Sequence, residues 1–357
     1  MLLMNNMKIL YSVLTKDALN PFLKTLTDAI KKEEENITLD FNPSYIWDER
    51  IYDFDILHIM WPEFLVSPKN TAADLKQRLI EIKNNGVRIV STCHNIEPHY
   101  CKDINKRDAI DICYGLSDTI HHLGQYSLNL LSKLYPDARH EHIPHHIYDN
   151  IYKDFLSKEE ACEYLGLSCH NSYILSIGAI RDIEEINLLK YVAKHLKNRV
   201  KLIAPSLILN IGKRSDFKIR IKYYKDKYLT YHNRLISNIG IISDEELPYY
   251  LAASDISLIQ RIRILNSGNV TLGMQAGNVI IGPEVGNVGV ILKETGNLTF
   301  NKQEDIPNLI DIALKASMQD KGMNNRQYAL SNWSSSIIAG KVLSSYRNLL
   351  SNSYLHD

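Results

Sequence analysis

Short apolar runs alternate with longer amphipathic stretches over the first part of the chain. Residues 7–14 (MKILYSVL), 55–62 (DILHIMWP) and 87–95 (VRIVSTCHN) are apolar runs of strand length. Residues 20–32 and 71–86 lie between them and place apolar side chains at helical spacing, which predicts two amphipathic helices. This order of strands and helices predicts a parallel sheet with crossover helices.

Residues that favour helix ends mark the boundaries of these two helices. Asn20 and Pro21 suit the cap and the first turn of the first helix, and Gly86 suits the end of the second. Two shorter segments, 117–124 and 139–146, predict later strands of the same sheet. The first part of the chain therefore predicts one doubly wound α/β domain.

The same alternation resumes near residue 171 and predicts a second sheet. We predict strands at 171–180, 200–206, 233–242, 256–260 and 278–281, with helices at 184–198, 243–255 and 270–277. After the last of these strands we expect a turn at Gly282-Pro283 and a loop that holds Gly286 and Gly289. The predicted fold class is therefore α/β, with two Rossmann-like doubly wound domains.

The chain length also favours more than one domain, because 357 residues exceed what one typical core accommodates. We predict an N-terminal domain over residues 1–150 and a C-terminal domain over 151–330. A C-terminal amphipathic helix within 331–357 is expected to pack back on the N-terminal domain. We place the hinge in 147–170, where a short polar-faced helix is predicted.

A run of Gly-Asn pairs raises the question of an internal repeat. The pairs begin at residues 268, 277, 286 and 296, at spacings of nine, nine and ten. We predict that the first pair begins a helix, the second ends it and the third lies in a loop after a strand. A structural repeat places each copy at the same position of the same unit, so we interpret the spacing as coincidence.

Composition and charge exclude some classes of function. Lys plus Arg and Asp plus Glu number 41 each, so the formal net charge is zero and the basic excess typical of nucleic-acid binders is absent. The five cysteines form no Cys-x-x-Cys pair, which favours a reducing compartment. The sequence shows neither a signal peptide nor an apolar run of membrane-spanning length, so we expect a cytoplasmic protein. Residues 213–227 are basic, and we interpret them as a solvated helix face, with peripheral contact to the inner membrane face as the alternative.

The turn at residues 266–269 is the best candidate for ligand chemistry. Asn266, Ser267, Gly268 and Asn269 follow a predicted strand and begin a predicted helix. The first N–H groups of a helix have no internal partner and the helix dipole adds positive charge there, so a phosphate group fits such a site. The alternative is that Asn and Ser only cap the helix.

Ordered segments that span nearly the whole chain match one known pattern. They are NPFLKTLTDAI, DILHIMWPE, VRIVSTCHNIEPH, ARHEHIPHHIY, ILSIGAIRD, ISDEELPYYLAASDISLI and LNSGNVTLGMQAGNVIIGPEVG. Together they resemble glycosyltransferases of the GT-B fold, of the family 4-like kind. The resemblance implies two Rossmann-like domains facing across a cleft, with a nucleotide-sugar donor bound by the C-terminal domain and an acceptor bound by the N-terminal domain.

The resemblance also implies an activity. It is that of a hexosyltransferase-type enzyme moving a sugar from a UDP- or GDP-linked donor to a glycan or lipid-linked acceptor, in surface polysaccharide synthesis. The nucleotide-sugar is a substrate, so we expect no cofactor, and the UDP or GDP product is expected to bind. We expect no bound metal, because arginine and helix dipoles neutralise the leaving diphosphate in such enzymes. A nucleic-acid partner is not expected.

Site residues follow from the same resemblance. Gly178 and Arg181 are expected to face the donor diphosphate, and the turn described above to hold a phosphate. His94 is expected near the transferring sugar, with Glu97 and His99 contacting the acceptor. If the reaction inverts the anomeric centre, one of these last three residues serves as base. If it retains the configuration, the sequence shows no clear nucleophile.

The chain departs from the family pattern at the donor site. Glu184 and Glu185 follow Arg181 where family members commonly have a lysine. Leu265 and Gly273 stand where many members carry two glutamates, the second of which usually grips the ribose. These departures reduce the expected affinity for a nucleotide.

Two arginines offer compensation for the missing lysine. Our hypothesis is that Arg261 and Arg263, which lie just before the turn, supply the positive charge. The departures also favour a second function, that of a catalytically weak GT-B relative acting as a binding or scaffold subunit. A third, a sugar-nucleotide epimerase, is disfavoured because TCHNIEPH and IGAIR match the transferases more closely.

Several histidines and one tryptophan allow both a structural and a functional interpretation. The histidine pairs at 121–122 and 145–146, with neighbours at 140 and 142, lack metal-ligand spacing and are interpreted as surface or hinge residues. His94 also fits a structural histidine bonded to loop backbone. Trp61 either stacks on a sugar or packs against the protein.

Overall fold

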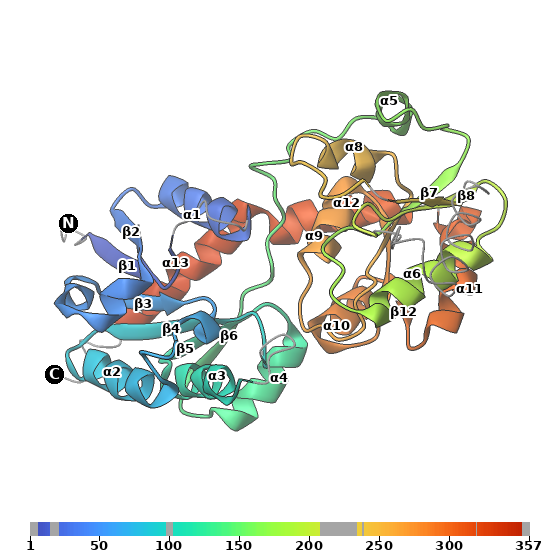
Figure 1. Ribbon diagram of the computed structural model, residues 1–357. Coiled ribbons are helices and arrows are strands. Elements are labelled where there is room, and N and C mark those ends of the chain that lie inside the picture. Colours follow the sequence, from blue (N-terminus) through green and yellow to red (C-terminus); the bar gives the residue numbers. More distant parts are fainter. Residues whose placement is uncertain are drawn as a thin grey trace. The chain divides into compact units, whose positions relative to one another are not determined.

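The chain folds as two compact units, each built on one parallel sheet of six strands (Figure 1). The computed structural model describes residues 6–14, 21–97, 103–207, 234–237, 239–318 and 320–351. The first unit is Met1–Ile151 with Trp333–Asp357, and the second is Tyr152–Asn332. Every strand pairing between described residues is parallel. The predicted α/β class with two doubly wound domains is confirmed.

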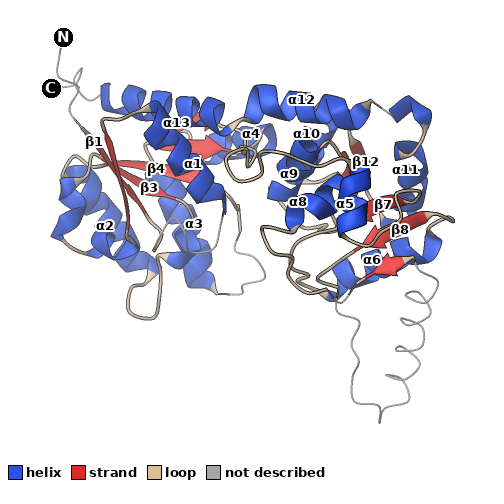
Figure 2. Ribbon diagram, turned by 90° about the horizontal axis from the view of Figure 1, so that it is seen from above, coloured by secondary structure: helices blue, strands red, loops and turns tan. Residues whose placement is uncertain are grey.

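The first unit has helices on both faces of its sheet. Its strands are β1 (Met7–Tyr11), β2 (Ile37–Phe41), β3 (Ile56–Ile59), β4 (Arg88–Cys93), β5 (Thr119–His122) and β6 (Arg139–His142). Its helices are α1 (Pro21–Glu33), α2 (Ala72–Asn84), α3 (Ile104–Leu116), α4 (Gln125–Leu134) and α13 (Ser335–Ser351), with short 3-10 helices η1 (Pro43–Trp47), η2 (Glu49–Asp53) and η3 (Pro62–Phe64). The strand order is β2-β1-β3-β4-β5-β6. Helices α1 and α13 pack together on one face and α2 and α3 on the other (Figure 1, Figure 2).

The two predicted helices of this unit form where expected. Helix α1 begins at Pro21, while its predicted cap, Asn20, lies outside the described residues. Before α2, the Thr71 amide donates to Asp74 Oδ2 at 2.8 Å and the Asp74 amide donates to Thr71 Oγ1 at 3.3 Å, which forms a capping box. Gly86 follows α2 with a φ of 89°, a left-handed conformation that favours glycine. Local sequence therefore sets both ends of α2.

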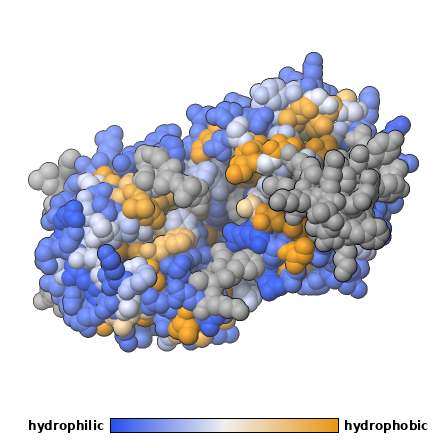
Figure 3. Space-filling model, viewed as in Figure 1, coloured by the Kyte–Doolittle hydropathy of each residue, from blue (hydrophilic) through white to orange (hydrophobic). Residues whose placement is uncertain are grey.

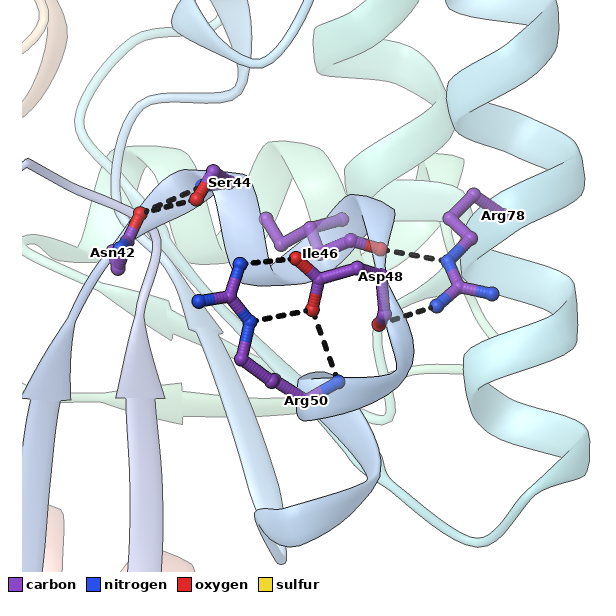
Figure 4. A network of polar contacts seen from close by, with 6 residues as sticks. All are labelled: Asn42, Ser44, Ile46, Asp48, Arg50 and Arg78. Carbon is purple, nitrogen blue, oxygen red and sulfur yellow. Dashed lines mark hydrogen bonds and ion pairs between the residues drawn. The ribbon is translucent and has the colours of Figure 1, made fainter.

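The segment between β2 and β3 is held by Arg78 of α2 (Figure 4). Arg78 donates from Nε to the Ile46 carbonyl at 2.7 Å and from Nη2 to the Asp48 carbonyl at 2.8 Å. The Asp48 side chain accepts from the Arg50 amide at 3.0 Å and from Arg50 Nε at 2.9 Å. One planar guanidinium thereby binds a carbonyl of η1 and the carbonyl of the residue that joins η1 to η2, a geometry that lysine does not offer.

A buried polar cluster ties α13 to the sheet of the first unit. Tyr346 Oη lies 2.9 Å from Tyr11 Oη and 2.5 Å from His58 Nδ1. His121 Nε2 lies 2.8 Å from Ser345 Oγ. The C-terminal helix is therefore joined to β1, β3 and β5 by hydrogen bonds as well as by apolar packing.

Most of the paired histidines are core residues, so their interpretation as surface or hinge residues is wrong. His121, His122 and His146 are at most 1% exposed. His122 Nε2 lies 2.8 Å from His140 Nδ1, and His146 Nε2 lies 2.9 Å from the Phe22 carbonyl oxygen. Among the described residues, no group of three His, Cys, Asp or Glu side chains is arranged to hold a metal ion. These rings instead satisfy buried polar groups of the core.

Acidification is expected to destabilise the first unit through its buried histidines. Burial lowers the pKa of His121 to about 3 and the pKa of His58 well below its usual value. In the unfolded chain the histidine pKa returns to about 6.5, so below that pH the unfolded state binds protons that the folded state excludes. Stability is therefore complete above about pH 6.5 and falls toward the folded pKa, by about 2 kcal/mol per imidazole at pH 5. Urea unfolding at pH 7.5 and pH 5 measures this loss, and equal free energies of unfolding at both values would contradict it.

The second unit also covers its sheet on both faces. Its strands are β7 (Ser172–Leu175), β8 (Val200–Ile203), β9 (Leu235–Ile236), β10 (Ile256–Leu258), β11 (Val279–Pro283) and β12 (Leu298–Phe300). Its helices are α5 (Lys158–Tyr164), α6 (Ile183–His195), α8 (Leu247–Ala252), α9 (Gly268–Ala276), α10 (Gly286–Glu294), α11 (Ile306–Ala313) and α12 (Lys321–Trp333), with 3-10 helices η4 (Gln303–Asp305) and η5 (Ala316–Met318). The strand order is β12-β11-β10-β7-β8-β9. Within the described residues β9 is shorter than the strand predicted over 233–242.

The Gly-Asn pairs occupy equivalent positions in two consecutive helix–strand units. The loop predicted around Gly286 is wrong, because α10 begins there, just as α9 begins at Gly268. Gly277 and Gly296 follow the two helices with φ of 86° and 65°. The first pair begins α9 and the second ends it, as predicted, and the same order of start and end recurs at α10, which also has nine residues.

Asn278 and Asn297, from the two Gly-Asn pairs that follow α9 and α10, both bond to a third buried asparagine, Asn325. Asn325 of α12 donates to the Asn278 carbonyl at 2.8 Å, and Asn297 donates to Asn325 Oδ1 at 3.0 Å. Asn297 Oδ1 also accepts from the Ile280 amide at 2.9 Å. This network fixes the start of α12 against the strands β11 and β12.

Exposed apolar side chains lie in separate places on the surface. Figure 3 shows several distinct orange patches on the face in view. The most exposed large apolar residues include Ile241, Leu14 and Met323, from different segments of the chain. No helix within the described ranges is both long and apolar enough to cross a membrane.

Candidate functional site

Each sheet has one point at which its winding direction reverses, and ligands of open parallel sheets bind beside this point at the carboxyl ends of the strands. In the second unit the chain proceeds from β7 outward to β8 and β9, then returns to β10 on the other side of β7. The loops that follow β7 and β10 therefore flank the reversal point. In the first unit the same point lies between β1 and β3.

The loops after β7 and β10 are joined by direct contacts. Asn269, in the first turn of α9, donates from Nδ2 to the Ile177 carbonyl at 2.9 Å. Gly178 has a φ of 101°, and a Cβ there would lie 3.4 Å from Asn269 Nδ2. Ser176 Oγ donates to Gln260 Oε1 at 2.9 Å. Gly178 and the turn before α9, which the sequence placed in one site, are therefore neighbours.

The N-terminus of α9 is open, whereas that of α10 is closed by the chain itself. No described residue accepts a hydrogen bond from the amide of Gly268 or Asn269, and the cap residue Ser267 makes no side-chain cap bond. At α10, by contrast, the Leu265 carbonyl accepts from the Asn287 amide at 2.9 Å and from the Val288 amide at 3.3 Å. At the start of α9 two amides thus have no acceptor among the described residues, whereas at α10 the Asn287 and Val288 amides are satisfied. Unsatisfied amides at a helix start are the groups that bind anions.

Asn266 is directed to the neighbouring helix. Its Oδ1 accepts from Asn287 Nδ2 at 2.7 Å. Asn287, in the first turn of α10, thus donates to the loop after β10, just as Asn269, in the first turn of α9, donates to the loop after β7. Asn266 thus shapes the loop before α9.

The two acids and the two arginines near this turn pair with one another. Arg261 Nε lies 2.9 Å from Glu185 Oε1, in a pair whose side chains are 15% and 1% exposed. Arg263 Nη2 lies 2.5 Å from Glu184 Oε2, in a far more exposed pair. The acids at the start of α6 therefore do not face the turn as unmatched charges. Arg181, on the connecting loop, is exposed.

Packing explains one departure from the family pattern. A Cβ at Gly273 would lie 2.7 Å from Ser257 Oγ and 2.8 Å from Ile280 Cδ1. Helix α9 approaches β10 and β11 so closely that position 273 has no room for a carboxylate side chain. The glutamate expected at this position from the resemblance therefore does not fit there.

The first unit gathers aromatic and acidic side chains after β3 and β4. Trp61 stacks on His94 with ring centroids 4.8 Å apart and an interplanar angle of 24°. Burial, with a smaller effect of His145, lowers the pKa of His94 to about 3, so the ring is neutral at pH 7. Glu97 is exposed on the following loop, and His99 lies outside the described residues.

Glu63 is a residue that the sequence analysis did not select for the site. It is 7% exposed on η3, and its Oε1 accepts from Asn95 Nδ2 at 3.2 Å. Burial raises the pKa of this carboxyl group. The signal that could have found it is its position directly after a strand beside the reversal point, in the same loop as Trp61.

Comparison with known proteins was made for both sequence and structure. No family model matches the chain, and no curated protein matches its sequence. Sucrose-phosphate synthase from Thermosynechococcus elongatus is similar with a TM-score of 0.75 at 14% identity, over 98% of this chain and 100% of that one. HepE from Anabaena in complex with UDP is similar with a TM-score of 0.71 at 14% identity, over 96% and 100%. A glycosyltransferase from Rickettsia africae gives 0.66 at 16% identity, over 98% and 100%.

At 14–16% identity, these structural similarities show a common fold alone. The shared architecture extends over nearly the whole chain and includes both six-stranded sheets. The chain therefore has the GT-B fold seen in these glycosyltransferases, as the resemblance predicted.

Proposed function

We propose that this protein is a glycosyltransferase of hexosyltransferase type, which moves a sugar from a UDP- or GDP-linked donor to a glycan or lipid-linked acceptor. The observation that carries the proposal is the open N-terminus of α9 beside Gly178, at the reversal point of the second sheet. The similar fold of HepE in complex with UDP supports a nucleotide as the anion. A role in surface polysaccharide synthesis, at the inner membrane face, suits such an acceptor.

In this proposal the leaving diphosphate is stabilised by the protein alone. The amides of Gly268 and Asn269, with the dipole of α9, lie where negative charge grows as the glycosidic bond breaks. Ser267 and Arg181 add further donors. No metal ion is required, because these groups supply the positive potential.

The acceptor is bound by the first unit in the same proposal. Trp61, half-buried and stacked on His94, is an aromatic side chain of the kind that packs against sugar rings. An inverting reaction needs a base, and His94, Glu97 and His99 are the candidates. A pKa of about 3 makes His94 a weak base, which favours the other two.

A second function, that of a binding or scaffold subunit, is favoured by one observation. Position 273 cannot hold the ribose-binding carboxylate, because Ser257 and Ile280 occupy its space. A protein that binds a nucleotide weakly and transfers no sugar fits this feature.

Product release separates the two functions. The purified protein is incubated with a panel of UDP- and GDP-sugars, with and without glycan and lipid-linked acceptors that receive the sugar. Released UDP or GDP is quantified, while calorimetry measures binding of the same donors. The proposal expects release above the protein-free rate with at least one donor. Binding without release supports the scaffold function, and absence of binding to every donor contradicts the enzyme.

A further inference from the structure

The loop that follows Gly178 is held at two places by one buried ion pair. Glu185 Oε2 accepts from the Arg181 amide at 3.2 Å, and Glu185 Oε1 accepts from Arg261 Nε at 2.9 Å. Arg261 Nη2 then donates to the Ala179 carbonyl at 2.9 Å. Backbone atoms on both sides of residue 180 are thus fixed by the same two side chains.

Within this ion pair the Glu185 carboxylate is more deeply buried than the Arg261 guanidinium. The Glu185 side chain is 1% exposed and that of Arg261 is 15% exposed, whereas Ala179 and Arg181 are exposed. A buried carboxylate is tolerated when charged and hydrogen-bonding partners satisfy it, and here both its oxygens have one. The charge of Arg261 is therefore matched within the protein by Glu185, and one of its nitrogens donates to the loop directly.

We infer that Glu185 and Arg261 are a positioning pair, which holds residues 179–181 in place for the donor phosphates, and that Arg261 does not itself bind them. This replaces the hypothesis that Arg261 supplies charge to the donor. The inference rests on the proposed function, because it assigns the loop after Gly178 to the phosphates.

The two roles predict opposite effects of replacing Glu185 by glutamine. If Arg261 binds phosphate directly, Glu185→Gln removes a competing negative charge, and donor affinity increases. If the pair positions the loop, the substitution loses the charge-assisted bond to Arg261, and donor affinity decreases. We expect the dissociation constant for the donor nucleotide to rise by roughly tenfold or more, in line with the strength of hydrogen bonds to charged groups.

Matched variants separate the effect of losing the contact to the loop from the effect of removing a negative charge. Glu184→Gln removes the neighbouring negative charge without touching the loop, so it is expected to leave affinity equal or higher. Asp311→Asn disrupts an ion pair between α11 and Lys197, away from the loop, and controls for loss of a surface carboxylate. Arg261→Lys keeps the charge but loses the forked contact, so it is expected to weaken binding as Glu185→Gln does.

Calorimetry with UDP and GDP on these variants, with amide hydrogen exchange of the Arg181 N–H, tests the inference. We expect weaker binding and faster exchange at Arg181 in Glu185→Gln and in Arg261→Lys, with neither effect in Asp311→Asn. Tighter or unchanged binding in Glu185→Gln would overturn the positioning role. If the unaltered protein binds no nucleotide, the proposed function fails, while the exchange rates still report whether the pair holds the loop. Unchanged exchange at the Arg181 amide would overturn the claim that Glu185 and Arg261 hold this loop, whether or not nucleotide binds.

Discussion

Replacing Ser267 by aspartate is expected to weaken nucleotide binding by roughly 100-fold or more, because a carboxylate about 4 Å from a phosphate costs several kcal/mol at a partly buried site. Ser267 is the cap residue of α9 and makes no cap bond of its own. An aspartate there accepts from the first amides of the helix, which are the groups assigned to the phosphate. It also interacts favourably with the helix dipole, so the fold is expected to gain up to about 1 kcal/mol.

The matched control is Ser267→Asn, which has the same shape and caps the helix without a negative charge. We expect it to lose much less affinity than the aspartate variant. Isothermal titration with UDP and GDP measures affinity, and thermal unfolding measures stability. Equal affinities for the aspartate and asparagine variants would show that the helix start does not hold an anion.

Replacing Gly322 by alanine is expected to cause the largest loss of stability of any single methyl group added to a described glycine. A Cβ at this position would lie 1.9 Å from the Gly277 carbonyl oxygen and 3.0 Å from its carbon. Both contacts are with backbone, so no rotamer change relieves them. The start of α12 would have to move away from the end of α9, which breaks the Asn325 bonds to Asn278 and Asn297. We expect a loss of roughly 4 kcal/mol or more, the range of severe overpacking and broken polar networks.

Gly340→Ala is the control for this substitution. Gly340 also lies within a helix, α13, but nothing lies within 4 Å of a Cβ built there. Alanine at an open helical position is expected to stabilise the fold by about 0.5–1 kcal/mol. Urea unfolding of both variants should therefore give changes of opposite sign. A Gly322→Ala variant as stable as the parent would contradict the close approach of the two backbones.

The sequence predicts most elements whose signals are local. Helix α2 has a capping box at one end and, after the other, a glycine with a left-handed φ, and the residue types at both ends predict these features. Helix α3 is not predicted, because only four of its residues, Ala109, Ile110, Cys113 and Tyr114, are buried and its first turn is largely polar. Helix α10 is not predicted, because it begins at a glycine, Gly286, and glycine is more typical of a loop. Gly286 has a left-handed φ of 55°.

The candidate site is predicted only in part, because only some of its features depend on local sequence. The turn before α9 is a local pattern of strand, Asn-Ser-Gly-Asn and helix, so sequence alone locates it. The pairing of Glu185 with Arg261 joins residues 76 positions apart, and only the adjacency of β7 and β10 brings them together. The absence of a carboxylate at Gly273 is visible in the sequence, but its cause, the close packing against Ser257 and Ile280, is a property of the fold.

The most direct test of the central claim is amide hydrogen exchange with and without UDP or GDP. The open N-terminus of α9 is expected to bind the nucleotide phosphates, so the amides of Gly268 and Asn269 should become protected when nucleotide is added. The amides of Asn287 and Val288, which already donate to Leu265, should not change. Nucleotide binding that leaves the α9 amides unprotected would contradict the account.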